Sequence, residues 1–302
     1  MLSTVNWTGG GDGVNWSDPN NWSSAPNLPG SSDDVVINAS GPLTINHASG
    51  NDSINSISST NSQVSLDLSG GSLAVSANST IAGSFTNSGT LHLTSGTLHL
   101  TGGVTSTGGV FVVDAGAELP MGGGVSLDAA SSVSGAGSVG FNPGSVTVAG
   151  RYNVTGETDL EPNSGDTVDF SGNVQNVGTT LFVELASGGQ PTPVITFHNT
   201  PINVTNLTLP GGVLTTGPIQ ASSFTWSGGT LQGTGTVTVS NSMTIGGGDE
   251  TLDGRILNNS GTAAWIGGSG SIHLIDGAVL NNQSTGSFLI ENSQQVIDGN
   301  GT

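Results

Sequence analysis

Several aspartates lie in glycine-rich loops, where their carboxylates could bind calcium. The loops are Gly9-Gly10-Gly11-Asp12-Gly13, Asp33-Asp34, Gly246-Gly247-Gly248-Asp249-Glu250 and Asp298-Gly299-Asn300-Gly301. Because calcium prefers carboxylate and carbonyl oxygens on tight turns, the candidate ligands are Asp12, Asp33, Asp34, Asp249 and Asp298. No loop has the spacing of an EF-hand or of the glycine-rich nonapeptide repeat. The alternative is that each aspartate accepts hydrogen bonds from nearby backbone amides, so calcium is a possible cofactor and no other is expected.

Three tryptophans share a similar setting near the start of the chain: Trp7, Trp16 and Trp22 each follow an asparagine. Indole rings can stack on sugars, so these residues are candidates for sugar binding. Indole rings also form compact apolar interiors, and this second interpretation stays open.

Two histidines, His92 and His99, flank Ser95-Gly96. If Ser95-Gly96 is a two-residue hairpin turn, the two imidazoles are cross-strand neighbours that could share a metal ion. If it is a corner between strands that run on in one direction, the histidines lie on different faces and are ordinary exposed side chains.

The strands that position these side chains are visible in short alternating runs such as Thr90-Leu91-His92-Leu93 and Thr236-Val237-Thr238-Val239. A period of two places alternate side chains on opposite faces of a strand. Glycine, which supplies 50 of the 302 residues, separates the runs and indicates tight turns. The chain is therefore predicted to be all-β.

A repeat of 23 positions relates Ile256-Leu257-Asn258-Asn259 to Val279-Leu280-Asn281-Asn282. Repeats of this length are typical of solenoids. We predict a parallel β-helix, or β-solenoid, with about 20–23 residues per coil and an N-terminal cap, in which the Asn-Asn pairs are in register and form amide ladders. A pair of β-sandwiches is the alternative.

Four segments are predicted from the composition. Residues 1–50 form a tryptophan-rich cap, 51–150 and 211–302 form regular coils, and 151–210 form irregular coils or an insertion with longer loops, since proline is poorly tolerated in central strands.

The chain has a formal charge of −19, with Arg151 and Arg255 as its only basic residues besides histidine. Such a chain repels phosphate backbones and anionic membrane surfaces, so nucleic acid is excluded as a partner. No segment has the length of a membrane helix, and we expect no membrane insertion. There is no cysteine, and Met1-Leu2-Ser3-Thr4 lacks the features of an export signal. We expect a piece of a larger protein at the cell surface or outside the cell.

The motif Phe224-Thr225-Trp226-Ser227-Gly228-Gly229, the Leu-Asn-Asn repeats and the opening Trp7 to Val35 resemble the repeat regions of large bacterial surface proteins. These include autotransporter passengers and filamentous-haemagglutinin-like adhesins. The resemblance implies a secreted or cell-surface β-solenoid with a structural or adhesive role.

Two alternatives remain for the function. One is a β-helix that binds or cleaves a neutral glycan in a groove beside residues 151–210, with Asp166 and Asp169 as the carboxylates to test. The other is a fibre subunit that joins copies of itself end to end. We expect no enzyme, because lyases with this fold use Arg or Lys as base and this chain has only two such residues. The partners that we consider are therefore surface glycans or a second copy of the chain.

Overall fold

The computed structural model describes residues 3–183, 192–198, 200–267, 270–291, 293 and 295–299. The chain divides into two compact units, Met1–Gly156 and Glu157–Thr302, and each is described by itself. Both consist of short parallel strands, and the chain forms about 12 turns of a β-solenoid. A single turn of 3₁₀ helix, η1 (Pro19–Asn21), lies in the first unit. Among the described residues, no helix has the length and apolarity needed to span a bilayer.

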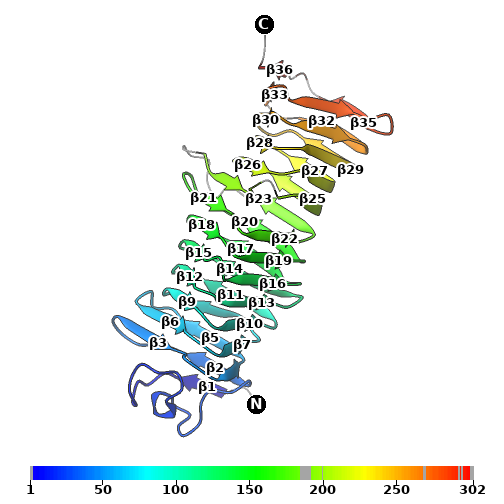
Figure 1. Cartoon of the computed structure of the whole chain (residues 1–302). Helices are drawn as coiled ribbons and strands as arrows, with labels where there is room; N and C mark the ends of the chain where they lie inside the picture. The colour runs from blue at the N-terminus through cyan, green and yellow to red at the C-terminus, as the bar shows by residue number, and fades with distance from the viewer. Residues whose placement is uncertain are drawn as a thin grey trace. The chain divides into compact units, whose positions relative to one another are not determined.

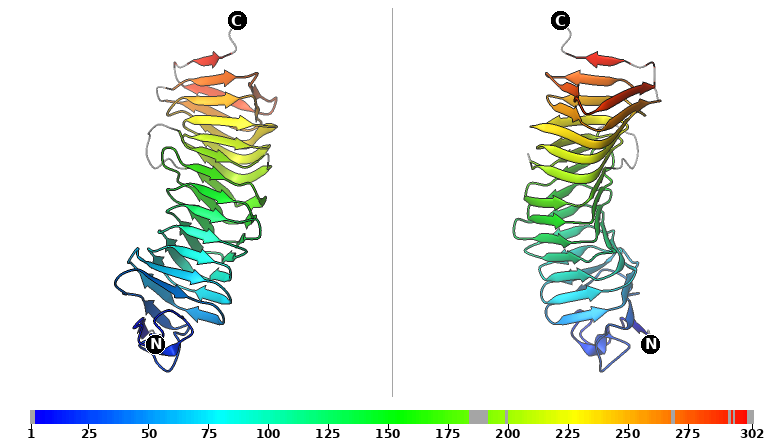
Figure 2. Two further views of the ribbon diagram at one scale, coloured as in Figure 1. Left: turned by 60° about the vertical axis from the view of Figure 1, so that its left-hand side comes forward. Right: turned by 90° about the vertical axis from the view of Figure 1, so that its right-hand side faces the viewer.

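From β2 (Asp33–Val36) onward, each turn of the N-terminal unit contributes one strand to each of three faces (Figures 1 and 2). The first face contains β1 (Ser3–Asn6), β2 (Asp33–Val36), β5 (Ser56–Ser59), β8 (Ser79–Ile81), β11 (Gly96–Leu100), β14 (Ala117–Met121) and β17 (Ser138–Phe141). The second face contains β3 (Leu43–Asn46), β6 (Val64–Leu68), β9 (Phe85–Asn87), β12 (Val104–Ser106), β15 (Val125–Leu127) and β18 (Val146–Val148). The third face contains β4 (Asn51–Ile54), β7 (Ser72–Val75), β10 (Thr90–Leu93), β13 (Val110–Val113), β16 (Ser132–Gly135) and β19 (Arg151–Val154).

The C-terminal unit has the same winding, but some of its strands continue around a corner. One sheet contains β20 (Glu157–Leu160), β23 (Thr180–Val183), β25 (Ile202–Leu209), β27 (Ile219–Trp226), β29 (Thr236–Ile245), β31 (Ile256–Asn259), β32 (Thr262–Ile266), β34 (Val279–Asn282) and β35 (Ser287–Glu291). A second sheet contains β21 (Thr167–Asp169), β24 (Val194–Thr196), β26 (Val213–Thr216), β28 (Gly229–Gly233), β30 (Glu250–Asp253), β33 (Ile272–Ile275) and β36 (Val296–Asp298). Among the residues of this unit that the structure describes, no strand pairs with β22 (Asn173–Val177).

The pairing direction confirms the solenoid and rejects the alternative of two β-sandwiches. Every pair of named strands with a defined register is parallel, for example β10 with β7 and with β13. Sandwiches are built from antiparallel hairpins and Greek keys, whereas parallel neighbours one turn apart arise when a chain winds in one direction.

Inward side chains form continuous apolar columns along each face. On the third face Leu73, Leu91, Phe111, Val133 and Tyr152 occupy equivalent positions in successive turns. All five are at most 1% exposed. Burying an aliphatic or aromatic side chain of this size stabilises a fold by about 1.5–3 kcal/mol, so these columns are the main source of stability.

The length of a turn varies between the units. In the N-terminal unit, paired positions after the first turn are 18 to 22 residues apart, as in Ser72 with Thr90 and Val110 with Ser132. In the C-terminal unit the offset is 27 between Thr167 and Val194 but 17 between Val213 and Thr230. The predicted 20–23 residues per coil lies within this wider range.

Corner asparagines connect sequence to geometry in both units. The side-chain oxygens of Asn87 and Asn259 accept hydrogen bonds of 3.0 and 3.2 Å from the amides of Gly89 and Gly261, two positions later. Asn258 pairs with Asn281, and Asn259 with Asn282, as the 23-residue repeat predicted. The short polar side chain satisfies the corner backbone while glycine takes the sharp bend.

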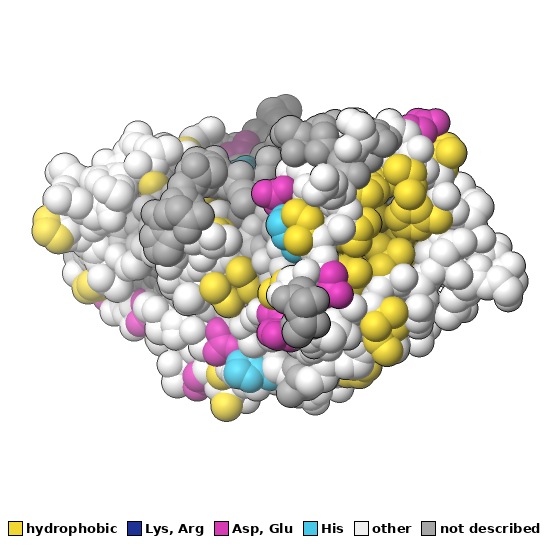
Figure 3. Space-filling view, turned by 90° about the horizontal axis from the view of Figure 1, so that it is seen from above, with side chains coloured by type: hydrophobic (Ala, Val, Ile, Leu, Met, Phe, Trp, Pro, Cys, Tyr) yellow, Lys and Arg dark blue, Asp and Glu magenta, His cyan; other side chains and the backbone are white. Residues whose placement is uncertain are grey.

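The last turn of the C-terminal unit carries exposed apolar side chains. Seen from its C-terminal end, yellow hydrophobic atoms gather on this face (Figure 3). The large hydrophobic residues exposed there are Val279, Leu289, Ile290, Val296 and Ile297. Within the described residues, no strand covers the outer edges of β34, β35 and β36.

Candidate functional site

The three N-terminal tryptophans pack against one another. Trp22 contacts Trp7 and Trp16 edge to face, with ring centroids 4.8 and 4.7 Å apart, and the indole nitrogen of Trp22 donates to the carbonyl of Trp16 at 2.8 Å. The exposed fractions are 8% for Trp7, 0% for Trp16 and 1% for Trp22. Their ring faces are covered, so the geometry fits the interpretation as a cap interior and leaves no exposed platform for sugar stacking.

Asp12 holds the loop beside these rings together. One of its carboxylate oxygens accepts from the backbone amides of Val14 and Asn15 and from the side-chain amide of Asn21, at 2.8 to 3.0 Å. Its other oxygen accepts from the side-chain amide of Asn15 at 2.6 Å. These donors hold the pKa of Asp12 well below its usual value, and the backbone amide of Asn15 has the largest effect. Because N–H groups surround the carboxylate, it has the environment of a backbone cap rather than that of a calcium ligand.

Asp33 and Asp34 serve the adjoining strands in the same way. Asp33 accepts from the amide of Gly30 at 2.7 Å and from the hydroxyl of Ser3. Asp34 accepts from the hydroxyl of Ser56 at 2.6 Å and the side chain of Asn55 at 2.7 Å, and these two bonds lower its pKa. The two neighbours alternate in direction along β2, so they do not converge on one ion.

The remaining calcium candidates lie in the C-terminal unit. Asp249 accepts from the amide of Ser271 at 2.8 Å, and its carboxylate is 3.8 Å from the imidazole of His273. Asp298 ends the short strand β36. The neighbouring Asn300 and Gly301 of its loop lie outside the described residues. In the part of the chain that the structure describes, no three His, Asp or Glu side chains gather as a metal site.

Of the two arrangements considered for His92 and His99, the hairpin is excluded and the corner is observed. His92 lies in β10 on the third face and His99 in β11 on the first face, and both strands pair in parallel with adjacent turns. Ser95-Gly96 is therefore a solenoid corner, and the two imidazoles point from different faces. His92 instead contacts Asp114 of the next turn at 2.9 Å.

The carboxylates proposed for a catalytic test have local partners. Asp166 accepts from the backbone amide of Asn163 at 2.8 Å. Asp169 contacts the imidazole of His198 at 2.5 Å. Both carboxylates therefore already interact with neighbouring groups of the C-terminal unit.

Two buried charged groups were missed by the sequence analysis. Glu250 is 0% exposed, and neither oxygen of its carboxyl has a hydrogen bond of normal geometry within the described residues, although the backbone amides of Glu250, Gly248 and Gly246 lie close enough to oppose part of the rise in its pKa. Burial first, and the charge of Asp249 second, raise the pKa of Glu250 to about 7. Charged side chains are normally assigned to the outside of a strand, although the period-two alternation that places Leu252 inside would also have placed Glu250 inside.

Arg255 is 1% exposed and extends along a corner across two preceding turns. Its guanidinium donates to the hydroxyl of Thr216 and the carbonyl of Gln232 at 2.8 Å, and to the carbonyl of Gly217 at 2.6 Å. Burial lowers the pKa of Arg255 to about 10, so the group stays charged at neutral pH. Its hydrogen bonds therefore connect the turn that contains Arg255 to the two preceding turns.

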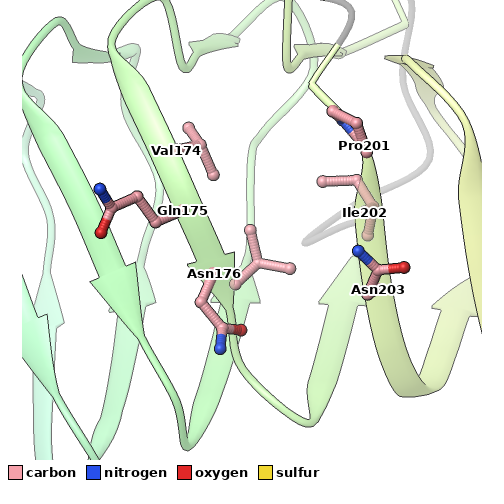
Figure 4. A pocket seen from close by; sticks show the side chains of 7 residues that line it. Val174, Gln175, Asn176, Pro201, Ile202 and Asn203 are labelled. Atoms are coloured by element: carbon pink, nitrogen blue, oxygen red, sulfur yellow. The ribbon is translucent and has the colours of Figure 1, made fainter.

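A cavity of about 150 Å³ opens between β22 and the start of β25 (Figure 4). Its lining consists of Val174–Val177 and Pro201–Asn203. These residues lie inside the segment 151–210, for which the sequence predicted irregular coils or an insertion with longer loops, and beside which the glycan alternative placed a groove. The individual lining residues carry no motif that would have identified them.

The chain matches no protein-family model and has no significant match among curated proteins or solved structures.

Proposed function

We propose that this chain is a structural module of a bacterial surface or secreted protein, without catalytic activity. The observation that carries the proposal is the in-register stacking of turns within each unit, through apolar columns and side-chain amide bonds. A parallel stack in which each turn contacts its neighbours gains stability from every interface. Such a module suits a spacer or a support for other parts of a larger protein.

The surface chemistry supports a location outside the cell. Trypsin cuts after Lys and Arg, and the chain has only two such residues. Arg255 is buried, so Arg151 is the only exposed basic residue at which the folded chain can be cut. The resemblance to the repeat regions of bacterial surface proteins points to the same location.

Trypsin digestion of an Arg151→Ala variant tests the structural proposal. Its only remaining site is Arg255, and cleavage there requires the C-terminal unit to open. We expect the folded variant to stay intact under conditions in which the same variant, unfolded in urea, is cut rapidly. Equal cleavage rates with and without urea would contradict a stable stack.

The enzymatic alternative is tested with neutral polysaccharides as substrates. Reducing ends that appear with the native chain and are lost in Asp166→Asn or Asp169→Asn would show catalysis and overturn the structural proposal. Substitution to asparagine removes the carboxylate with little change of shape, so loss of activity would not reflect misfolding.

End-to-end association is the second candidate, because Leu289 and Ile290 are 52% and 57% exposed on the last turn. Exposed apolar groups beside uncovered strand edges favour pairing with another chain. Sedimentation velocity over a range of concentrations tests this, with Ile290→Lys as the variant that should shift the distribution to monomer.

A further inference from the structure

The cavity between β22 and β25 is a break in the otherwise continuous strand ladder of the C-terminal unit. Ile202–Val204 pair with Ile219–Ala221 of β27 on one side. On their other side the register with β23 covers only Asn206–Thr208. Among the described residues of this unit, Ile202–Val204 therefore have a strand partner on one side only, and the cavity lies along their open edge (Figure 4).

At one end of this break, β25 is hydrogen-bonded to the residue that precedes β23. The carbonyl of Thr179 accepts hydrogen bonds from the amides of both Thr205 and Asn206, at 2.8 and 2.9 Å. The ladder resumes from that point. The opening is therefore a wedge held at one end, which is a preformed cavity rather than a loose loop.

The lining combines amide side chains with apolar ones and contains no charged residue. Asn176 uses its side-chain oxygen to accept from the amide of Gly178 at 2.9 Å, which leaves its NH₂ group as a donor. The side-chain amide of Asn203 makes no hydrogen bond to the described residues, so it offers a donor and an acceptor. Val174 is half-buried and supplies the apolar surface, whereas the side chain of Ile202 is only 1% exposed.

We propose that this cavity binds one neutral sugar unit of a glycan. Hydroxyl groups both donate and accept hydrogen bonds, as side-chain amides do, and the C–H face of a sugar ring suits the half-buried side chain of Val174. An ionic ligand would find no opposite charge in the lining, and its desolvation would be uncompensated. A volume of about 150 Å³ suits a single small unit rather than a long ligand.

This site would add adhesion to the structural role, and it does not depend on that role. A stable stack that binds no sugar would leave the structural proposal intact, whereas sugar binding by a chain that trypsin cuts readily would leave only the binding site.

Titration of the ¹⁵N-labelled full chain followed by NMR tests the proposal. The probes are maltose, lactose, mannobiose and N,N′-diacetylchitobiose, each raised to concentrations that would saturate a millimolar site. We expect at least one to shift the backbone amide signals of Val174–Val177 and Ile202–Asn203. Galacturonate, an acidic sugar, should leave these signals unchanged.

The matched variants are Asn203→Asp and Gln220→Glu. Asn203 and Gln220 are register partners on adjacent turns, both exposed, but only Asn203 lines the cavity. Both changes add one negative charge and replace an amide by an acceptor of the same shape. Asn203→Asp should weaken sugar binding by about tenfold or more, and Gln220→Glu should leave it within about twofold.

Three outcomes would overturn the proposal. In the first, no neutral sugar shifts the cavity signals, which would leave a cavity filled by water. In the second, a sugar binds but the two variants weaken it equally, which would place the site elsewhere. In the third, a peptide with the sequence of Asn173–Val177 shifts these signals and the sugars do not, which would make the wedge an acceptor for an extended strand.

Discussion

The side-chain amide of Asn259 donates a hydrogen bond of 2.7 Å to the side-chain oxygen of Asn282, one turn further along the solenoid. The same amide also donates to the carbonyl of Ser287 at 2.9 Å. Asn259 is fully buried, whereas its neighbour Asn258 faces outward and accepts from Asn281 at 3.2 Å. Two adjacent asparagines thus form two ladders, one inside the stack and one at its surface.

Substituting each of these asparagines by aspartate should show how much each ladder contributes to the free energy of unfolding. Asn259→Asp removes both donors and buries a carboxylate against two oxygen acceptors, so we expect the free energy of unfolding to fall by roughly 3–5 kcal/mol. Asn258→Asp keeps the acceptor that Asn281 uses and should change it by no more than about 0.5 kcal/mol. Urea denaturation followed by circular dichroism measures both. Equal losses would show that the inner ladder has no special role.

The fold was predictable because its information is local and repeated. The alternation in Thr236-Val237-Thr238-Val239 fixes which side chains enter the core, and the 23-residue repeat brings Leu257 beside Leu280. Corner asparagines and glycines recur at the positions where the chain bends. Each of these signals needs only the spacing of residues along the chain.

The site was less predictable because it depends on which turns meet. The separation of His92 from His99 depends on whether Gly96 reverses the chain or turns a corner, and both readings suit glycine. The cavity arises where a strand partner is missing beside Ile202–Val204, and a sequence pattern does not report a missing partner. Glu250 and Arg255 are charged residues of a kind that usually lies at the surface, but both side chains are buried.

Glu250 should make the stability depend on pH. Its pKa is raised from 4.5 to about 7 in the folded chain, so the folded state binds this proton more tightly than the unfolded state. The resulting stabilisation is complete below pH 4.5, is lost as the pH rises to about 7, and stays lost above that. For a shift of this size the loss is on the order of 3 kcal/mol.

Glu250→Gln provides the comparison at each pH. The variant keeps the shape of the protonated side chain and cannot ionise. The other carboxylates contribute equally to the pH dependence of both chains, so their contribution cancels in the difference between the two unfolding free energies. We expect the two to differ little at pH 4.5 and the variant to be the more stable above pH 7. A difference that does not change with pH would show that Glu250 stays ionised in the folded chain.

Arg255 should be essential to the C-terminal unit. Arg255→Ala leaves the carbonyls of Gly217 and Gln232 without their donor and opens a cavity beside Thr216, so we expect a loss of about 3–5 kcal/mol in unfolding free energy. Arg151→Ala, at the exposed arginine, is the matched control and should cost less than about 1 kcal/mol. Differential scanning calorimetry would detect the loss as a lower transition temperature. Similar transition temperatures in the two variants would show that the hydrogen bonds of Arg255 between turns contribute little to stability.

Gly83 tests how closely successive turns approach. A Cβ atom at this position would lie 1.8 Å from the carbonyl oxygen of Val64 in the preceding turn, so Gly83→Ala forces two backbones apart. We expect a loss of about 1–3 kcal/mol or more in the free energy of unfolding. Gly30→Ala is the control, because its Cβ would meet nothing closer than 3.6 Å, the carboxylate of Asp33. That change should be neutral or slightly stabilising, because alanine restricts the unfolded chain. Urea midpoints that fall equally for both variants would mean that the turns have room to separate, and would contradict the close approach of Gly83 to Val64.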